Sequence, residues 1–238
     1  MTQRLGVLGG TFDPVHFGHL DAAAAARAAL ELDELLFVPS HDPPHRPVDP
    51  HATAYQRFAL VALAIDGLPG YRASDEELRR PGNSYTSDTL RALHAAGWTP
   101  LQIFFILGAD AFAEIASWHE FPAVLDAANF AVIARPGTSI EGALARTPAL
   151  RPRVRPVPAD AFECPTTGVF LIEAATRDVS STMIRSRLAA GQSIGDLVPP
   201  PVARHIAAHH LYARSVRRQP DQGAEDGLHG NHEDKTGR

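Results

Sequence analysis

Five short runs of apolar residues, separated by helix-forming stretches, constrain the fold of this chain more than any other feature. The runs cover Leu5–Leu8, Leu35–Val38, Ile103–Leu107, Phe130–Ala134 and Val169–Ile172. Helices are predicted over residues 20–32, 54–65, 87–96, 111–115 with a continuation near 123, 181–190 and 202–212. Such alternation is typical of α/β proteins. Because strands this uniformly apolar need cover on both sides, we predict a doubly wound parallel sheet with helices on both faces.

The most informative motif joins the first apolar run to the first predicted helix and has the sequence Gly9-Gly10-Thr11-Phe12-Asp13-Pro14-Val15-His16-Phe17-Gly18-His19. Its glycines let the backbone approach a ligand closely. His16 and His19 share one face if both lie in the first helical turn. That face meets the helix N-terminus, where free N–H groups favour anions and imidazole donors can follow charge on phosphoryl oxygens. We predict a triphosphate-binding site, with a glycine-rich turn and two surface histidines as the alternative.

Two other phosphate-binding loops do not match this motif. A dinucleotide-binding loop needs a third glycine, and a Walker-type loop needs Gly-Lys-Ser/Thr, and neither follows here. In a Rossmann-like sheet, ligands instead bind beyond the carboxyl ends of the strands, at the point where the strand order reverses. Two of the predicted strands end in glycine, at Gly9 and Gly108, as close approach of a ligand requires.

Length and charge limit the classes of protein that the chain can belong to. It has 238 residues, of which 45% are hydrophobic, and a formal net charge of −5. We predict one domain over residues 1–215, followed by a polar tail over 216–238, which from Gln219 onward has almost no apolar residues and is expected to be disordered. The last twenty residues hold five acidic and two basic side chains and so account for −3 of the net charge, which leaves the body nearly neutral. We therefore expect neither a nucleic-acid groove nor a membrane surface, because both need clustered Lys and Arg.

Cysteine content and the absence of a leader indicate the compartment. The single cysteine, Cys164, excludes an intramolecular disulfide and is expected to be a small semi-buried residue rather than a reactive thiol. No basic and apolar leader precedes the first strand, and no apolar run reaches membrane-spanning length. We expect a cytoplasmic protein. Its oligomeric state stays open, with a homo-oligomer as one alternative.

A proline-rich loop follows the second apolar run, over residues 39–47. It lies at the same edge of the predicted sheet as the first motif, and its prolines stiffen the chain. His45 and Arg46 are candidates for phosphate contacts, because Arg presents a planar fork to phosphate oxygens. His41, His45 and His51 could suggest a metal cluster. The chain offers no regular ligand spacing and no second cysteine, so we predict no protein metal site.

Two further segments have polar residues where a helix begins. Residues 83–90 place hydroxyl residues and an acid at a predicted helix N-terminus, which caps the helix and offers N–H groups to an anion near Thr86. Residues 179–185 place Ser180 and Ser181 at a second helix start, with Arg185 one turn beyond Ser181 and on the same face. In both segments a plain capped helix is the alternative.

Together these motifs resemble the nucleotidyltransferase superfamily, whose mark is an H-x-G-H-type motif after the first strand, and within it the bacterial nicotinate mononucleotide adenylyltransferases. The resemblance runs from residue 5 to about residue 212 and rests on six motifs in the family's order. They are the first motif, the P-P-H loop, S-Y-T-x-D-T-L, G-A-D with a later tryptophan, Ala134-Arg135-Pro136-Gly137, and V-S-S-T-x-I-R. The chain departs from the family in Arg46, where Lys is usual, and in Val179, where Ile is usual.

The resemblance implies roles for each motif. The ATP site would comprise Gly9, Gly10, Thr11, Phe12, His16, His19, Gly108, Asp110, Ser180, Ser181 and Arg185. The nicotinate mononucleotide site would comprise His45, Arg46, Thr86, Trp118 and Arg135. Thr86 and nearby amides would bind the carboxylate, and Trp118 would stack on the pyridine ring, with core packing as its alternative. Asp110 would accept from a ribose hydroxyl or orient a metal-bound water.

The implied reaction is adenylyl transfer from ATP to nicotinate mononucleotide, a step of NAD biosynthesis. His16, His19, Arg46 and Arg185 would neutralise the α-phosphoryl group and the leaving pyrophosphate. Mg²⁺ would enter with ATP, held by phosphate oxygens and water. Two alternatives stay open: a sister adenylyltransferase that uses nicotinamide mononucleotide or phosphopantetheine, and a nucleotide sensor without catalysis.

Overall fold

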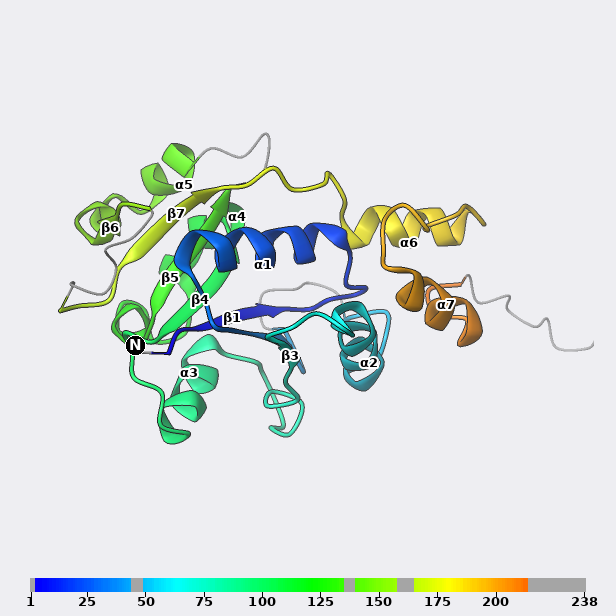
Figure 1. Cartoon of the computed structure of the whole chain (residues 1–238), viewed down its shortest axis with the longest axis horizontal. Helices are drawn as coiled ribbons and strands as arrows, with labels where there is room; N and C mark the ends of the chain where they lie inside the picture. The colour runs from blue at the N-terminus through cyan, green and yellow to red at the C-terminus, as the bar shows by residue number, and fades with distance from the viewer. Residues whose placement is uncertain (1–2, 44–48, 135–139, 158–164, 214–238) are drawn as a thin grey trace, which may run out of the picture.

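A computed structural model describes residues 3–43, 49–134, 140–157 and 165–213 of the chain. Seven strands of this part form one sheet in the order β3-β2-β1-β4-β5-β7-β6, with every neighbouring pair parallel (Figure 1). The strands are β1 (Leu5–Gly10), β2 (Glu34–Pro39), β3 (Tyr71–Ala73), β4 (Ile103–Gly108), β5 (Asn129–Ala134), β6 (Val154–Arg155) and β7 (Val169–Glu173). The predicted Rossmann-like parallel sheet is confirmed.

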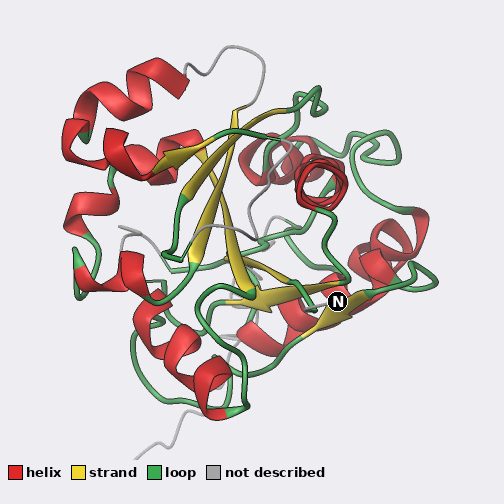
Figure 2. Cartoon of the chain, turned by 60° about the vertical axis from the view of Figure 1, so that its left-hand side comes forward, coloured by secondary structure: helices red, strands yellow, loops and turns green. Residues whose placement is uncertain are grey.

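Helices cover both faces of the sheet, as predicted (Figure 2). The α-helices are α1 (Phe17–Leu30), α2 (Ala54–Ile65), α3 (Thr86–Ala95), α4 (Ala109–Ala113), α5 (Ile140–Arg146), α6 (Ser181–Ala189) and α7 (Pro200–Ala208). Short 3₁₀ helices are η1 (Ile115–Ser117), η2 (Ala123–Asp126) and η3 (Pro148–Arg153). One core contains side chains of α1, α2, α6 and α7, and the other contains those of α3, α4 and η2.

Alternating side chains of β4 show why these strands are apolar throughout. Phe104 and Ile106 belong to the core beneath α1 and α2, whereas Ile103, Phe105 and Leu107 belong to the core beneath α3 and α4. Successive strand residues point to opposite faces, and both faces here are buried. The lack of polar alternation in the sequence therefore follows from the double cover.

The structure corrects several predicted boundaries. β3 and β6 were not predicted, because they have only three and two residues and lie at the two edges of the sheet. The first helix begins at Phe17 rather than at residue 20, because His16 is its extended N-cap. The last helix ends at Ala208 rather than at Tyr212, since His210 and Tyr212 have φ angles of 51° and 63°, in the left-handed region.

The strand order reverses beside β1, which lies between β2 and β4. The chain after β1 therefore passes over one face of the sheet, through α1, and the chain after β4 passes over the other, through α4. A crevice opens between such diverging connections at the carboxyl ends of the strands. The tail over 216–238 and Cys164 lie outside the described residues, and within the described ranges no helix is long and apolar enough to cross a membrane.

Candidate active site

A pocket of about 280 Å³ opens at this reversal of strand order. Its floor is formed by the ends of β1 and β4, and its walls come from α1, the loop after β2, the N-terminus of α3 and the segment after α4. Seven of the predicted site residues line it: Gly9, Gly10, Thr11, His19, Thr86, Gly108 and Trp118. Segments about a hundred residues apart in the sequence thus meet in one concave site.

The three glycines of the floor serve different purposes. A Cβ atom on Gly9 would lie 3.1 Å from the ring of Phe105, and one on Gly10 would lie 3.1 Å from the ring of Phe12. These two glycines make room for neighbouring aromatic rings. A Cβ atom on Gly108 would have no atom within 4 Å, so this position leaves open space for a ligand to approach the backbone.

The two histidines of the first motif form a stacked pair at the start of α1. Their ring centroids lie 3.7 Å apart, and His16 is buried while His19 lines the pocket. The backbone N–H of His16 donates to Nδ1 of His19 over 3.2 Å. Because Nδ1 accepts, Nε2 carries the proton of the neutral His19 ring and is its donor. A Cβ on Gly18 would lie 3.1 Å from Nδ1 of His16, so a glycine at position 18 makes room for the His16 ring.

Phe12 supports this pair from the core. Its ring is 2% exposed and meets the His19 ring edge-on, with centroids 5.0 Å apart. Phe12 has a φ of 50°, an uncommon backbone conformation for a bulky residue. Phe12 was predicted to bind ATP, and the structure places it beneath His19, outside the lining of the pocket.

The carboxylate of Asp13 connects the histidine motif to three other segments. It is fully buried, and it accepts from the backbone N–H groups of His51 at 2.9 Å and Ala52 at 3.1 Å. Arg185 lies 3.7 Å from the same carboxylate. Burial alone would raise the pKa of Asp13, but the two amide bonds, the adjacent Tyr212 hydroxyl and the charge of Arg185 lower it overall.

The start of α6 is attached to the same motif. Arg185 donates from Nη1 to the carbonyl oxygen of Asp13 over 2.7 Å, and the hydroxyl of Ser181 donates to the carbonyl of Pro14 over 2.9 Å. Ser180 caps the helix by accepting from the N–H of Met183. These three residues were predicted to bind ATP. The structure places them beside the motif, outside the lining of the pocket, with hydrogen bonds to the protein itself.

The N-terminus of α3 forms the wall that faces β4. Thr86 is the first residue of α3 and lines the pocket, as does Trp118, which follows η1. The indole of Trp118 packs edge-on against Phe105, with centroids 5.9 Å apart. Trp118 is therefore partly anchored in the core and partly open to a ligand, so that both predicted uses of this side chain fit its position.

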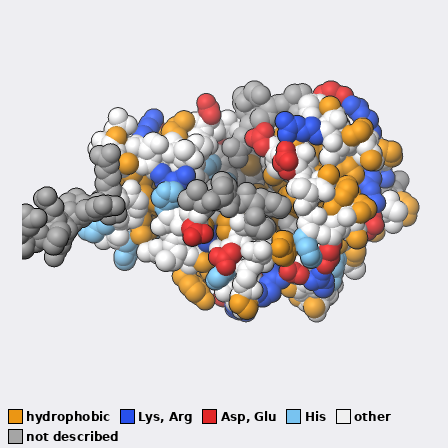
Figure 3. Space-filling model, turned by 180° about the vertical axis from the view of Figure 1, so that it is seen from behind, with side chains coloured by type: hydrophobic (Ala, Val, Ile, Leu, Met, Phe, Trp, Pro, Cys, Tyr) orange, Lys and Arg blue, Asp and Glu red, His pale blue; other side chains and the backbone are white. Residues whose placement is uncertain are grey.

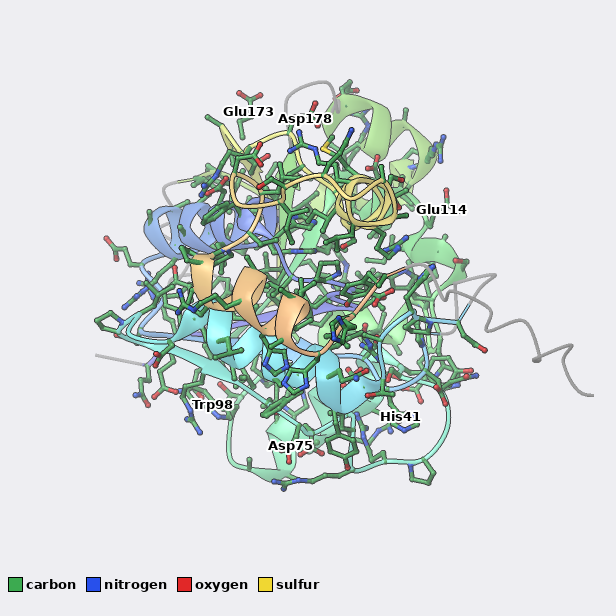
Figure 4. All side chains as sticks on the ribbon, turned by 90° about the vertical axis from the view of Figure 1, so that its right-hand side faces the viewer. His41, Asp75, Trp98, Glu114, Glu173 and Asp178 are labelled. Carbon is green, nitrogen blue, oxygen red and sulfur yellow. The ribbon has the colours of Figure 1, made fainter. Side chains whose placement is uncertain are left out.

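Other predicted site residues lie elsewhere. Asp110 is exposed in the first turn of α4 and does not line the pocket. His45, Arg46 and Arg135 lie outside the described residues. The Nδ1 atoms of His41 and His51 lie 3.1 Å and 3.4 Å from carboxylate oxygens of Asp42 and Asp13 respectively, and Figure 4 shows His41 on the loop after β2. Within the described residues, no group of three or more His, Cys, Asp or Glu could hold a metal.

Two buried polar residues that line the pocket, Ser40 and Glu77, were not among the predicted site residues. The hydroxyl of Ser40 is buried and has no hydrogen-bond partner among the described residues, so a ligand that bonded to it would satisfy it. Glu77 is buried in the turn after β3 and borders the same pocket. Ser40 belongs to the proline-rich loop that was singled out, whereas no sequence signal separates Glu77 from the charged residues around it.

The chain is similar in sequence and in fold to proteins of one enzyme class. A family model described as cytidylyltransferase-like matches residues 7–187. The Plasmodium falciparum nicotinic acid mononucleotide adenylyltransferase complexed with NaAD has the same fold, with a TM-score of 0.66 over 88% of this chain and 97% of that one, at 19% identity. The fold, the pocket and the family model thus define a nucleotidyltransferase.

Proteins with similar sequences show which family of nucleotidyltransferases the chain belongs to. A protein of Symbiobacterium thermophilum described as "Probable nicotinate-nucleotide adenylyltransferase" is 39% identical over 213 residues, which cover 89% of this chain and 96% of that protein. A protein of the same description from Pseudomonas aeruginosa is 38% identical and covers 89% of this chain and 98% of its own length. The chain belongs to the family of nicotinate-nucleotide adenylyltransferases.

The lowered pKa of Asp13 predicts how stability depends on pH. A carboxyl group has an ordinary pKa of about 3.9, so the stabilisation from Asp13 is complete above that pH and is lost as the pH falls through the lower pKa of the folded state. We expect Asp13→Asn to be less stable at neutral pH and to lose less stability on acidification. Urea denaturation between about pH 6 and pH 3 measures this, with exposed Asp66→Asn as the control. Parallel curves for Asp13→Asn and the wild type would contradict the assignment.

Proposed function

We propose that the chain transfers the adenylyl group of ATP to nicotinate mononucleotide, giving nicotinate adenine dinucleotide and pyrophosphate, a step of NAD biosynthesis. The observation that carries this proposal is that the starts of two helices meet one pocket, α1 through His19 and α3 through Thr86. Free N–H groups and the helix dipole favour negative charge at both points. One start suits a triphosphate, and the other suits the carboxylate of the acceptor.

The reaction depends on how the two substrates are positioned and on stabilisation of the charge on their phosphates, and it needs no general base from the protein. A phosphate oxygen of the acceptor attacks the α-phosphorus of ATP, the new oxygen–phosphorus bond forms, and the bond to the β-phosphate breaks in line to release pyrophosphate. The attacking phosphate monoester is already anionic near neutral pH. His19 donates from Nε2 to the α-phosphoryl oxygens, and His16, stacked on it, fixes its plane. Arg46 and Arg185 stabilise the charge of the leaving pyrophosphate.

Mg²⁺ fits this site as a companion of ATP rather than as a resident of the protein. The described residues contain no cluster of ligands for it, and Mg²⁺ commonly keeps waters and phosphate oxygens as ligands. When bound, it supplies charge neutralisation on the phosphates. The contribution of this chain is to hold ATP, with Gly108 leaving room for the nucleotide and Asp110 available to a ribose hydroxyl.

The acceptor occupies the wall opposite α1. Thr86 and the first amides of α3 bind the carboxylate, Trp118 stacks on the pyridine ring, and His45, Arg46 and Arg135 contribute to the phosphate side. Partners of other kinds have less support: Figure 3 shows Lys and Arg interspersed with Asp and Glu on one face, with no basic stripe of the kind that nucleic acid needs. A cytoplasmic location and a homo-oligomer stay predictions.

The choice of acceptor tests the proposed function. Charge-assisted hydrogen bonds contribute about 1.5–3 kcal/mol each, so one or two of them predict at least a roughly tenfold higher kcat/KM for nicotinate mononucleotide than for nicotinamide mononucleotide. Pyrophosphate release with ATP, Mg²⁺ and each acceptor measures it, with phosphopantetheine as a third acceptor. Equal use of both mononucleotides would refute the carboxylate assignment, and no release with any acceptor would indicate a nucleotide sensor.

His19→Ala tests the role of the α1 start. Loss of one transition-state donor lowers turnover by roughly 10²- to 10³-fold, and we expect this loss with the fold retained, because the His19 side chain lines an open pocket. Steady-state kinetics and circular dichroism of the variant measure both quantities. His209→Ala, an exposed histidine at the end of α7, is the matched control. Turnover close to that of the wild type would remove His19 from the mechanism.

Arg185→Ala separates phosphate binding from support of the motif. If Arg185 reaches the β- and γ-phosphates, its loss raises the KM for ATP more than the KM for nicotinate mononucleotide, because only ATP carries those groups. Titration of each substrate against a saturating partner measures this. Arg187→Ala is the control, because Arg187 lies on the same helix but pairs with Asp196. Equal weakening of both substrates would mean that Arg185 acts only through Asp13.

A further inference from the structure

Glu77 is a buried carboxyl group that borders the pocket and has no part in the reaction as described above. It lies in the turn between β3 and α3, and its side chain is 7% exposed. A carboxyl group is rarely buried without a specific set of partners, because desolvation of its charged form is costly. Figure 4 labels two neighbours of this region: Asp75, where the turn begins, and His41, in the loop after β2.

Glu77 is bonded to the start of α3. The hydroxyl of Thr89, in the first turns of the helix, donates to Oε1 of Glu77 over 2.5 Å. Ser84, before the helix, lines the same pocket as Glu77, and its hydroxyl lowers the pKa of the Glu77 carboxyl. Thr86, the proposed carboxylate contact, lies between Ser84 and Thr89 in the chain. Glu77 therefore holds the first turns of α3 through Thr89, one turn beyond Thr86.

These contacts extend to the neighbouring segments. Ser84 accepts from the backbone N–H of His41 over 2.8 Å, and the N–H of Ser84 donates to the carbonyl of Asp42 over 2.9 Å. On the other side, Arg80 donates to the hydroxyl of Thr89 over 3.0 Å. The segment before α3 is thereby tied to the loop after β2 through Ser84, and the first turns of α3 are tied to the turn after β3 through Thr89, Glu77 and Arg80.

Burial and the polar neighbours of Glu77 act in opposite directions on its carboxyl. Burial raises its pKa, although the hydroxyls of Thr89 and Ser84 and the charge of Arg80 act in the opposite direction. The hydrogen bond from Thr89 offsets part of the cost of burying this group and holds it beside the first turns of α3.

We propose that Glu77 is a positioning residue that sets the start of α3 for recognition of an anionic group on the acceptor. This inference rests on the proposed function, because it assigns Thr86 and the amides of α3 to the acceptor. Glu77 touches the helix rather than the reacting atoms, so its loss weakens the binding of the acceptor and spares the chemical step. ATP, bound by the start of α1 on the opposite wall, is unaffected.

Kinetics of three variants test the proposal. We expect Glu77→Ala to raise the KM for nicotinate mononucleotide by about 10- to 100-fold, the change that loss of one charge-assisted contact gives, with kcat and the KM for ATP within about threefold of wild type. Glu77→Gln keeps an oxygen acceptor for Thr89 and should restore the KM to within about threefold. Asp75→Asn, in the same turn but paired with Arg79 on the surface, is the control and should match the wild type.

The outcomes distinguish a failure of the positioning role of Glu77 from a failure of the proposed function. An unchanged KM for nicotinate mononucleotide in Glu77→Ala, or an equal rise in the KM for ATP, would overturn the positioning role while leaving the proposed function in place. If Glu77→Ala does not fold, Thr89→Val removes the partner hydroxyl instead and should raise the same KM alone. A wild-type protein that does not use nicotinate mononucleotide would overturn the proposed function and this inference together.

Discussion

The buried carboxylate of Asp13 is the interaction on which the geometry of the site depends. It lies three residues before the N-cap of α1, its bonded and charged partners come from the segment before α2 and from α6, and the hydroxyl of Tyr212, beyond α7, adjoins it. A buried charge is tolerated only where it is paired and hydrogen-bonded, so these segments cannot move independently. The position of His16, and through it of His19, follows from this arrangement.

Arg57 is a second buried charged residue that holds the loops around the pocket. This arginine of α2 is 1% exposed and donates to the carbonyl oxygens of Thr11 and His41, over 2.7 Å and 3.1 Å. A side chain from one helix thus fixes the loop after β1 and the loop after β2, which both border the pocket. Such preorganisation is how a site that works by orientation and charge lowers a barrier without a protein nucleophile.

The sequence predicted the strands and the strand and helix ends that short runs of neighbouring residues mark. β1, β4 and β5 are continuous apolar runs, and glycine, histidine and hydroxyl residues mark the strand and helix ends that meet at the pocket. The edge strands β3 and β6 carry no such signal, because neither is long enough to show a pattern. The early start of α1 at Phe17 depends on the extended conformation of His16, which the packing of Gly18 permits.

The site residues that sequence reasoning missed owe their place to tertiary contacts. Glu77 belongs to an Asp-Glu-Glu run that is typical of a solvated turn, but the structure buries it and bonds it to Thr89. Arg185 and Ser181 were predicted to bind phosphates, which stays a prediction, and the structure adds hydrogen bonds from both to the carbonyl oxygens of Asp13 and Pro14. A motif identifies which donors a segment offers, but it does not say which acceptor the fold presents to them.

The two walls of the pocket are held by separate networks, and this separation explains how one site can treat two substrates differently. The wall at α1 is fixed by Asp13, and the wall at α3 is fixed by Glu77. The loop after β2 touches both networks, because His41 accepts from Arg57 through its carbonyl and donates to Ser84 through its N–H. The distance between the two walls is therefore set by this loop, and in-line transfer requires that distance to place the acceptor phosphate opposite the leaving pyrophosphate.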